Sequence, residues 1–154
     1  KGEKAFRDTS GYNLLYSKTA IGSGGVFGKG YKQGSVTQGK FVPEQETDYI
    51  FCTVGEEWGF LGSSLLVIFY AVYIGRIYYL AENQKTTFNR VFGYCFAGVL
   101  LMHFAINLGM VMGLFPTVGI PLPYFSYGGS SFLAFSIMTA IFFKLNYTDK
   151  NSLV

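Results

Sequence analysis

Residues 91–143 contain no Lys, Arg, Asp or Glu, and this uncharged stretch restricts the fold more than any other feature of the chain. A soluble protein of 154 residues has too small a core to bury so long an apolar stretch. A lipid bilayer accommodates it directly, because a spanning helix needs about 20 mostly apolar residues. Charged residues make up only 14% of the chain, against about 25% in a typical soluble domain. The sequence therefore predicts an all-α integral membrane protein.

Three segments are long and apolar enough to form transmembrane helices. The first is predicted at about residues 60–80 and the second at about 91–115. The third, at about 126–145, reaches spanning length only with the Gly and Ser residues at its start, which contacts with other protein permit at membrane depth. Arg76 near the end of the first span can extend to the headgroup level beside neighbouring tyrosines.

Basic residues in the short connections predict the orientation of these spans. Lys85 and Arg90 lie between the first two spans, whereas loop 116–125 has no Lys or Arg. Because positively charged loops remain in the cytoplasm, the loop that carries these two residues and the tail 146–154 are expected there. Residues 1–57 and loop 116–125 are then expected on the outer side of the membrane.

The remaining composition argues against other classes of protein. The net charge of +3 is spread along the chain without a polybasic block, which gives no indication of nucleic-acid binding. Two cysteines, Cys52 and Cys95, form neither a disulfide framework nor a zinc site. The chain begins with Lys1 instead of Met, and we interpret it as part of a longer protein.

Residues 22–30, with the sequence GSGGVFGKG, form a glycine-rich segment of the outer region. A Walker loop would need Gly in place of Ser23 and Ser or Thr in place of Gly30, and the dinucleotide fingerprint would need Gly in place of Phe27. We therefore expect a tight external loop whose glycines allow positive φ angles and close packing on the spans. A role in guiding substrate along this loop is the alternative.

A short helix is predicted at about residues 44–57, directly before the first span. Pro43 suits the first turn of a helix, and the acidic residues that follow it favour a helix N-terminus. At helical spacing, Asp48 shares one face with Cys52, Gly55 and Gly59. A carboxylate leading an apolar helix at the membrane surface is a candidate functional group, and an ordinary solvated acidic loop is the alternative.

His103 and Asn107 are polar side chains inside the second predicted span. They lie four residues apart and therefore on one face of the helix. We interpret them as hydrogen-bonding groups that join helices, rather than as metal ligands or proton carriers. Glu56 and Glu57, at the outer edge of the first span, are given the same structural or supporting role.

Five motifs occur in an order that is similar to a known family. They are residues 20–30 (AIGSGGVFGKG), 41–51 (FVPEQETDYIF), 55–59 (GEEWG), 107–110 (NLGM) and 121–131 (PLPYFSYGGSS). Together they resemble the successive signatures of the shape, elongation, division and sporulation (SEDS) family, which includes RodA, FtsW and SpoVE, and they span nearly the whole chain. Residues 116–123 resemble the elongation type, RodA, more than the division type, FtsW, which typically has Lys near Val118 and Thr in place of Pro121.

The resemblance implies a peptidoglycan glycosyltransferase with roughly ten helices in the bacterial cytoplasmic membrane, of which this chain would be a C-terminal fragment with the last three. Such an enzyme polymerises lipid II on the outer side of the membrane. The implied partners are lipid II, undecaprenyl-pyrophosphate-linked glycan, membrane lipid and a class B penicillin-binding protein. A lipid II translocator (flippase) and a non-catalytic scaffold for the penicillin-binding protein are the alternatives.

The essential aspartate of the family falls on Asp48. Its carboxylate can take the proton from an attacking hydroxyl, bind a divalent cation such as Mg²⁺ or Mn²⁺ at the pyrophosphate, or do both. Basic candidates for binding the pyrophosphate are Lys29, Lys32 and Lys40, for which simple solvation is the alternative. Further substrate-binding candidates from the motifs are Glu44, Thr47, Ser126, Tyr127, Gly128 and Gly129. Glu46 stands where many members have His, and like-charge repulsion is expected to raise the pKa of Asp48.

Overall fold

The computed structural model describes residues 10–31, 33–34, 48–116 and 118–151, and within these ranges all regular structure is helical. The helices are α2 (Ser10–Ser23), α4 (Ile50–Glu82), α5 (Thr87–Met112) and α6 (Gly129–Asn151). Helices α4, α5 and α6 are long and apolar enough to cross a membrane. The predicted fold class, an all-α protein with three spans, is therefore confirmed.

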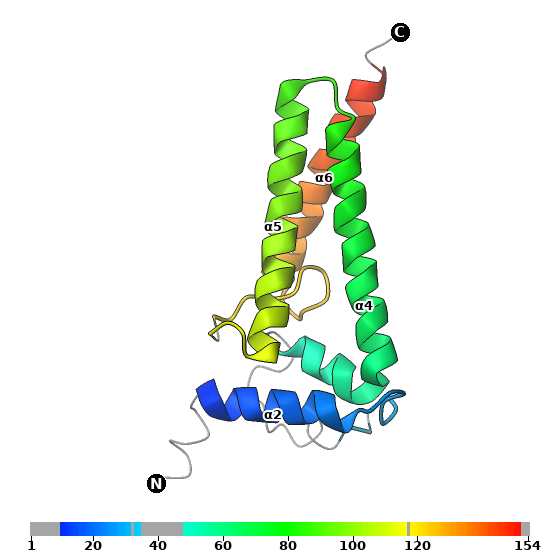
Figure 1. Ribbon diagram of the computed structural model, residues 1–154. Helices are drawn as coiled ribbons and strands as arrows, with labels where there is room; N and C mark the ends of the chain where they lie inside the picture. The colour runs from blue at the N-terminus through cyan, green and yellow to red at the C-terminus, as the bar shows by residue number, and fades with distance from the viewer. Residues whose placement is uncertain (1–9, 32, 35–47, 117, 152–154) are drawn as a thin grey trace.

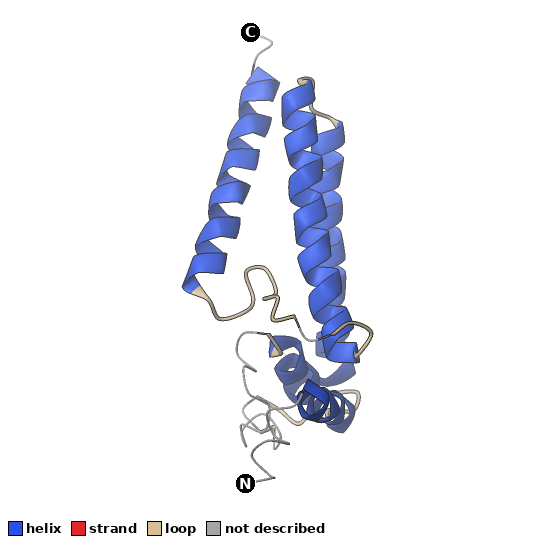
Figure 2. Cartoon of the chain, turned by 90° about the vertical axis from the view of Figure 1, so that its left-hand side faces the viewer, coloured by secondary structure: helices blue, strands red, loops and turns tan. Residues whose placement is uncertain are grey.

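The three long helices form one bundle with two different ends (Figure 1). Helices α4 and α5 run antiparallel and pack along their length, and α2 lies across one end of this pair. The short connection between α4 and α5 and the end of α6 lie at the opposite end. Figure 2 shows that α6 diverges from the α4–α5 pair towards the α2 end, where the segment between α5 and α6 is placed.

Helix α2 is an element that the sequence analysis missed, because residues 1–57 were expected to contain only the short helix near their end. The apolar residues of α2 show no strong helical periodicity. Its buried positions include the small residues Ser17 and Ala20, and the Ser17 hydroxyl donates a hydrogen bond to the Val111 carbonyl oxygen (3.4 Å). Packing against α4 and α5 therefore stabilises this helix more than its own sequence pattern does.

Helix α4 is broken at Gly59, whose φ of 65° and ψ of −158° lie in a region that only glycine occupies readily. Residues 50–58 run across the end of the bundle, and the chain then turns into the span (Figure 1). The predicted short helix thus exists from Ile50 onward, while residues 44–47 lie outside the described residues. The predicted shared face of Asp48 with three small residues was wrong, because Tyr49 has non-helical angles and the helix begins after Asp48.

The glycine-rich segment satisfies the backbone groups that the break in α4 leaves without helical partners. The amides of Lys29 and Gly30 donate to the carbonyl oxygens of Glu56 and Glu57, both at 3.0 Å. In the other direction, the amides after the break donate to the glycine-rich segment: Phe60 to the Gly25 oxygen (2.9 Å) and Leu61 to the Val26 oxygen (3.2 Å). The segment and the break therefore form one hydrogen-bonded unit.

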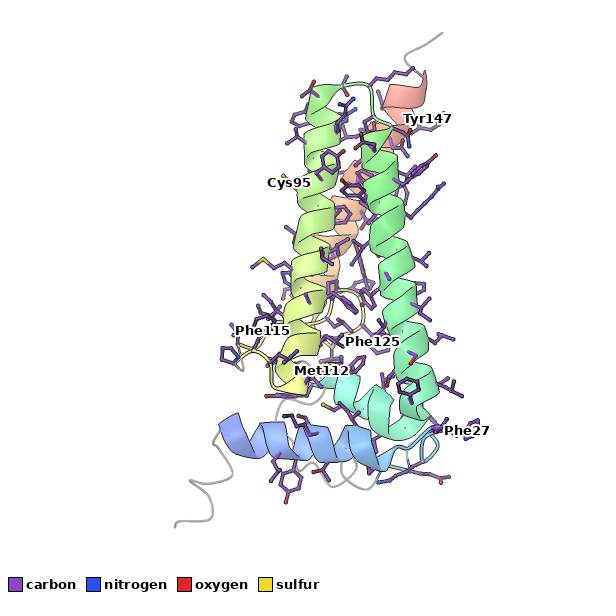
Figure 3. The ribbon with its side chains drawn as sticks, in the orientation of Figure 1. Phe27, Cys95, Met112, Phe115, Phe125 and Tyr147 are labelled. Carbon is purple, nitrogen blue, oxygen red and sulfur yellow. The ribbon has the colours of Figure 1, made fainter. Side chains whose placement is uncertain are left out.

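Close contact between backbones explains the glycines of this unit. A Cβ at Gly24 would lie 2.0 Å from the Gly55 oxygen, and a Cβ at Gly28 would lie 2.1 Å from the Glu57 oxygen. Positive φ angles occur at Gly25, Gly28 and Gly30 (56°, 80° and 100°). The expected tight loop packed on the spans is confirmed. At its tip, Phe27 is 83% exposed and projects away from the helices (Figure 3).

Substitution of Gly24 by Ala tests this packing. We expect Gly24→Ala to destabilise the fold by about 1–3 kcal/mol, because the new methyl group overlaps the Gly55 backbone oxygen. Gly22→Ala is the matched control, since a Cβ there would meet no neighbouring atom within 4 Å and Ala favours the helix. The measurement is the melting temperature of the detergent-solubilised protein, and equal values for the two variants would contradict the proposed contact.

Candidate functional site

Asp48 lies in the turn that precedes α4, at the end of the bundle that α2 covers. Its side chain is half-buried. The carboxylate oxygen Oδ2 is 3.2 Å from the point that a Cβ at Gly119 would occupy. Gly119 belongs to the segment between α5 and α6 and has a φ of 70°. Two segments distant in the sequence therefore meet at the carboxylate, and the absence of a side chain at Gly119 leaves the space beside it open.

Asn107 joins these two segments through a single side-chain amide. It is fully buried in α5, and its Nδ2 donates to the carbonyl oxygens of Asp48 (3.0 Å) and Ile120 (2.8 Å). Its Oδ1 is buried without a hydrogen-bond partner among the described residues. Asn107 is a structural hydrogen-bond donor, as expected, but both of its acceptors lie in non-helical segments beside the candidate catalytic carboxylate and not in another helix.

The segment between α5 and α6 folds back among the helices instead of forming a simple outer loop. Leu122 and Pro123 are buried, and side chains of the spans contact the carbonyl oxygens nearby. His103 Nδ1 lies 3.4 Å from the Pro121 oxygen, and the Tyr70 hydroxyl donates to the Pro123 oxygen. The prolines carry no backbone N–H, so fewer donors need partners at this depth. His103 and Asn107 thus share the task of fixing this segment.

Tyr124 is a non-glycine residue with a positive φ of 62°. Its hydroxyl donates to the Phe135 oxygen (2.8 Å) and also bonds Thr139, and the Tyr73 hydroxyl donates to it at 3.4 Å. Such a backbone conformation persists where the surroundings hold it in place. The sequence analysis missed the contribution of the tyrosines in the spans, although a tyrosine hydroxyl inside an apolar helix signals a hydrogen-bond partner elsewhere.

Four of the predicted substrate-binding residues come together at one cavity. A cavity of about 490 Å³ is lined by Ile50, Phe125, Phe132 and the run Ser126, Tyr127, Gly128 and Gly129. Ile50 is the second residue after Asp48, so the cavity opens close to the turn that carries the carboxylate. Ser126 is buried and its Oγ accepts a hydrogen bond from the Leu122 amide (2.8 Å), whereas Tyr127 is 77% exposed.

Lys29 forms an ion pair instead of being a simply solvated loop lysine. Its Nζ lies 2.8 Å from Glu56 Oε1, and the Glu56 side chain is fully buried. Ser23 Oγ donates to the same oxygen at 3.5 Å. The alternative of simple solvation is therefore wrong for Lys29, because its ammonium group pairs with a buried carboxylate. Glu57 is half-buried beside it.

Several predicted site residues lie outside the described part of the chain. They are Lys32, Lys40, Glu44, Glu46 and Thr47. The described residues contain no group of three or more His, Cys, Asp or Glu side chains that could hold a metal ion together. Among the described residues, Asp48 is thus the candidate that supplies a carboxylate to a bound ligand at this place.

Tyr49 separates Asp48 from the first turn of α4. Burial raises the pKa of the Tyr49 hydroxyl above its ordinary value, and the nearby Cys52 and Asp48 add to this shift. The phenol therefore stays neutral over the range in which a carboxylate titrates. It contributes apolar packing next to Asp48, within the buried cluster that also contains Leu122 and Val111.

Removal of the Asn107 amide tests whether it fixes the site. Asn107→Leu keeps a similar volume but leaves two buried carbonyl oxygens without their donor, so we expect a loss of about 2–4 kcal/mol of unfolding free energy. Asn83→Leu is the control, because the Asn83 amide bonds only an exposed carbonyl within its own helix turn. Thermal unfolding in detergent measures both, and an unchanged melting temperature for Asn107→Leu would contradict the bridging role.

Comparison with families and curated proteins gives consistent matches. A family model described as "Cell cycle protein", which covers FtsW, RodA and SpoVE, matches residues 3–151. "Peptidoglycan glycosyltransferase MrdB" of Escherichia coli (strain K12) is 43% identical over 124 residues, which are 80% of this chain and 34% of that protein. "Peptidoglycan glycosyltransferase RodA" of Treponema pallidum (strain Nichols) is 36% identical over 137 residues, covering 89% of this chain and 32% of that protein.

Similarity extends to a division-type protein and to a solved structure. "Probable peptidoglycan glycosyltransferase FtsW" of Coxiella burnetii is 37% identical over 145 residues, covering 92% of this chain and 39% of that protein. A solved structure described as "Structural coordination of polymerization and crosslinking by a peptidoglycan synthase complex" aligns with a TM-score of 0.75 and 27% identity, over 90% of this chain and 37% of that one. The chain spans about a third of the length of the curated relatives that it matches.

Proposed function

The chain belongs to the cell cycle protein family of FtsW, RodA and SpoVE, and from this premise we propose that it is part of a peptidoglycan glycosyltransferase that polymerises lipid II during cell-wall elongation. The resemblance inferred from the five motifs is confirmed at the level of the family, and relatives named MrdB and RodA agree with the elongation type. Because the chain spans about a third of these relatives, the proposed polymerase is the longer protein that contains it.

The position of Asp48 carries this proposal. Asn107 holds the backbone carbonyl oxygen of Asp48 at the end of the spans, and the Asp48 carboxylate lies beside Gly119. Ile50, two residues further on, lines the cavity together with residues 126–129. A carboxylate in a fixed position at an open cavity suits proton transfer to or from a bound substrate. The relatives named peptidoglycan glycosyltransferases support the reaction type.

The proposed reaction uses Asp48 as the general base. The acceptor hydroxyl oxygen of lipid II attacks the anomeric carbon of the glycan donor, and the bond from that carbon to the undecaprenyl pyrophosphate oxygen breaks. The proton of the acceptor hydroxyl moves to Asp48, and the pyrophosphate leaves with the electron pair of the broken bond. Asn107 contributes by fixing the backbone of Asp48, so that the carboxylate need not be ordered during the reaction.

A divalent cation fits this site only together with the substrate. The described residues offer Asp48 as a ligand and no further cluster of metal-binding side chains. Mg²⁺ is often held by one or two carboxylates plus substrate phosphates, and the donor carries a pyrophosphate. We therefore include Mg²⁺ or Mn²⁺, bound by Asp48 and the pyrophosphate, where the cation would stabilise the charge of the leaving group.

The chain is a multi-pass membrane protein, and its orientation is part of the proposal. Lys85 and Arg90 lie at the end of the bundle that also carries the end of α6, whereas Asp48 lies at the opposite end. The positive-inside rule then places the C-terminal end in the cytoplasm and Asp48 outside. The structural relative described as coordinating polymerization and crosslinking supports a class B penicillin-binding protein as the partner.

Asp48→Asn in the longer protein that contains this chain tests the proposed chemistry. We expect glycan synthesis from purified lipid II to fall by about 10²-fold or more, because an amide cannot accept the proton. Expression, melting temperature and binding of the penicillin-binding protein should stay unchanged. Glu82→Gln, an exposed carboxylate at the opposite end of α4, is the matched control and should retain full activity.

The other outcomes separate the remaining functions. Retained polymerisation by Asp48→Asn would overturn the assignment of the base. A protein that moves lipid II across vesicle membranes but forms no glycan would instead be a translocator. A protein that does neither, yet binds the penicillin-binding protein, would be a scaffold.

A further inference from the structure

The part of α4 that follows Asp48 is joined to the membrane span at a break in the helix, at Gly59. Residues 50–58 form the first part of the helix, and Gly59 turns the chain into the span. The regular helix is interrupted at this residue, since the φ and ψ of Gly59 lie outside the helical region. The direction of residues 50–58, and with it the position of Asp48, must therefore be fixed by contacts from elsewhere.

The glycine-rich segment makes those contacts on both sides of the break. Two of its amides bond the carbonyl oxygens of Glu56 and Glu57, and two of its carbonyl oxygens accept from Phe60 and Leu61. The segment thus bridges the end of the first part of α4 and the start of the span. The glycine-rich segment can fix the angle between these two parts of α4 only while its hydrogen bonds to both of them are intact.

The Lys29–Glu56 ion pair lies at the centre of this bridge. Lys29 donates its backbone amide to the Glu56 carbonyl oxygen at 3.0 Å and its Nζ to Glu56 Oε1 at 2.8 Å. The same two residues are therefore joined through both main chain and side chain. The Glu56 side chain has no exposed surface, while that of Lys29 keeps 29% of its own. A carboxylate so deeply buried is tolerated because a cation and a hydroxyl accompany it.

We propose that Lys29 and Glu56 are positioning residues, whose ion pair keeps the glycine-rich segment seated on the break in α4 and so holds Asp48 at the cavity. Lys29 then acts on the protein rather than on the pyrophosphate of the substrate. This inference rests on the proposed function, because the ion pair affects catalysis only if Asp48 is the catalytic residue. In this role neither side chain has to contact the reacting atoms.

Neutralising one or both members of the ion pair distinguishes a positioning role of Lys29 from a role in binding the substrate pyrophosphate. Lys29→Met leaves the Glu56 carboxylate buried without its cation, so we expect kcat for glycan synthesis to fall at least tenfold with less than a twofold change in KM for lipid II. Lys29→Met combined with Glu56→Gln removes the buried charge as well, and this double variant should recover at least threefold of the lost kcat. Lys29→Arg preserves the pair and should stay within threefold of the original kcat.

Thermal unfolding of the same variants tests the ion pair independently of activity. The melting temperature of the detergent-solubilised longer protein should fall in Lys29→Met and rise again in the double variant. Kinetics are measured well below every melting temperature, so that a smaller folded fraction does not explain a lower kcat. Lys18→Met removes an exposed lysine of α2 and should change neither quantity.

The results that would overturn the proposal differ from those that would overturn the proposed function. If Lys29→Met raises KM and the double variant is no more active than the single one, Lys29 binds substrate and the positioning role is wrong. If Lys29→Met keeps full kcat, the pair does not position Asp48. If the unaltered protein forms no glycan at all, the proposed function fails and this inference fails with it.

Discussion

A protein that crosses a membrane must satisfy every backbone N–H and C=O group within itself, because the bilayer core offers no water as a partner. Among the places where the described backbone leaves the helical pattern near one end of the bundle are the break at Gly59 and the segment between α5 and α6. At the first, another stretch of main chain supplies the missing partners. At the second, Tyr70, His103 and Asn107 of the spans supply contacts to the carbonyl oxygens.

These two irregular places are also where the candidate site is assembled. A helix alone cannot present a carboxylate, an adjoining glycine and a cavity from three separate parts of the chain. The departures from helical geometry bring Asp48, Gly119 and residues 126–129 to one end of the bundle. Several hydrogen bonds hold each of these departures, so the irregular backbone has a defined course beside the helices.

The spans and the family could be predicted from the sequence, because apolar length and ordered motifs are local properties of a chain. Asp48 was found by its motif, but its surroundings were not. Its position depends on Asn107 and Gly119, which are distant in sequence. Helix α2 was missed because packing stabilises it. The role of Lys29 was misjudged because the burial of Glu56 becomes visible only once the glycine-rich segment is folded onto α4.

The contact between the glycine-rich segment and the break in α4 also has a consequence for how such chains can vary. Gly24 faces Gly55 and Gly28 faces Gly59, with main chain touching main chain in both cases. A Cβ at Gly24, Gly28 or Gly59 would overlap the main chain of the opposite segment, whereas a Cβ at Gly55 would meet the Ile21 side chain, so a change in either motif must still fit the other. The two motifs therefore form one structural unit, although about thirty residues separate them in the sequence. In a hybrid protein built from two members of the family, the glycine-rich segment of one parent must leave the same room for the break in α4 of the other.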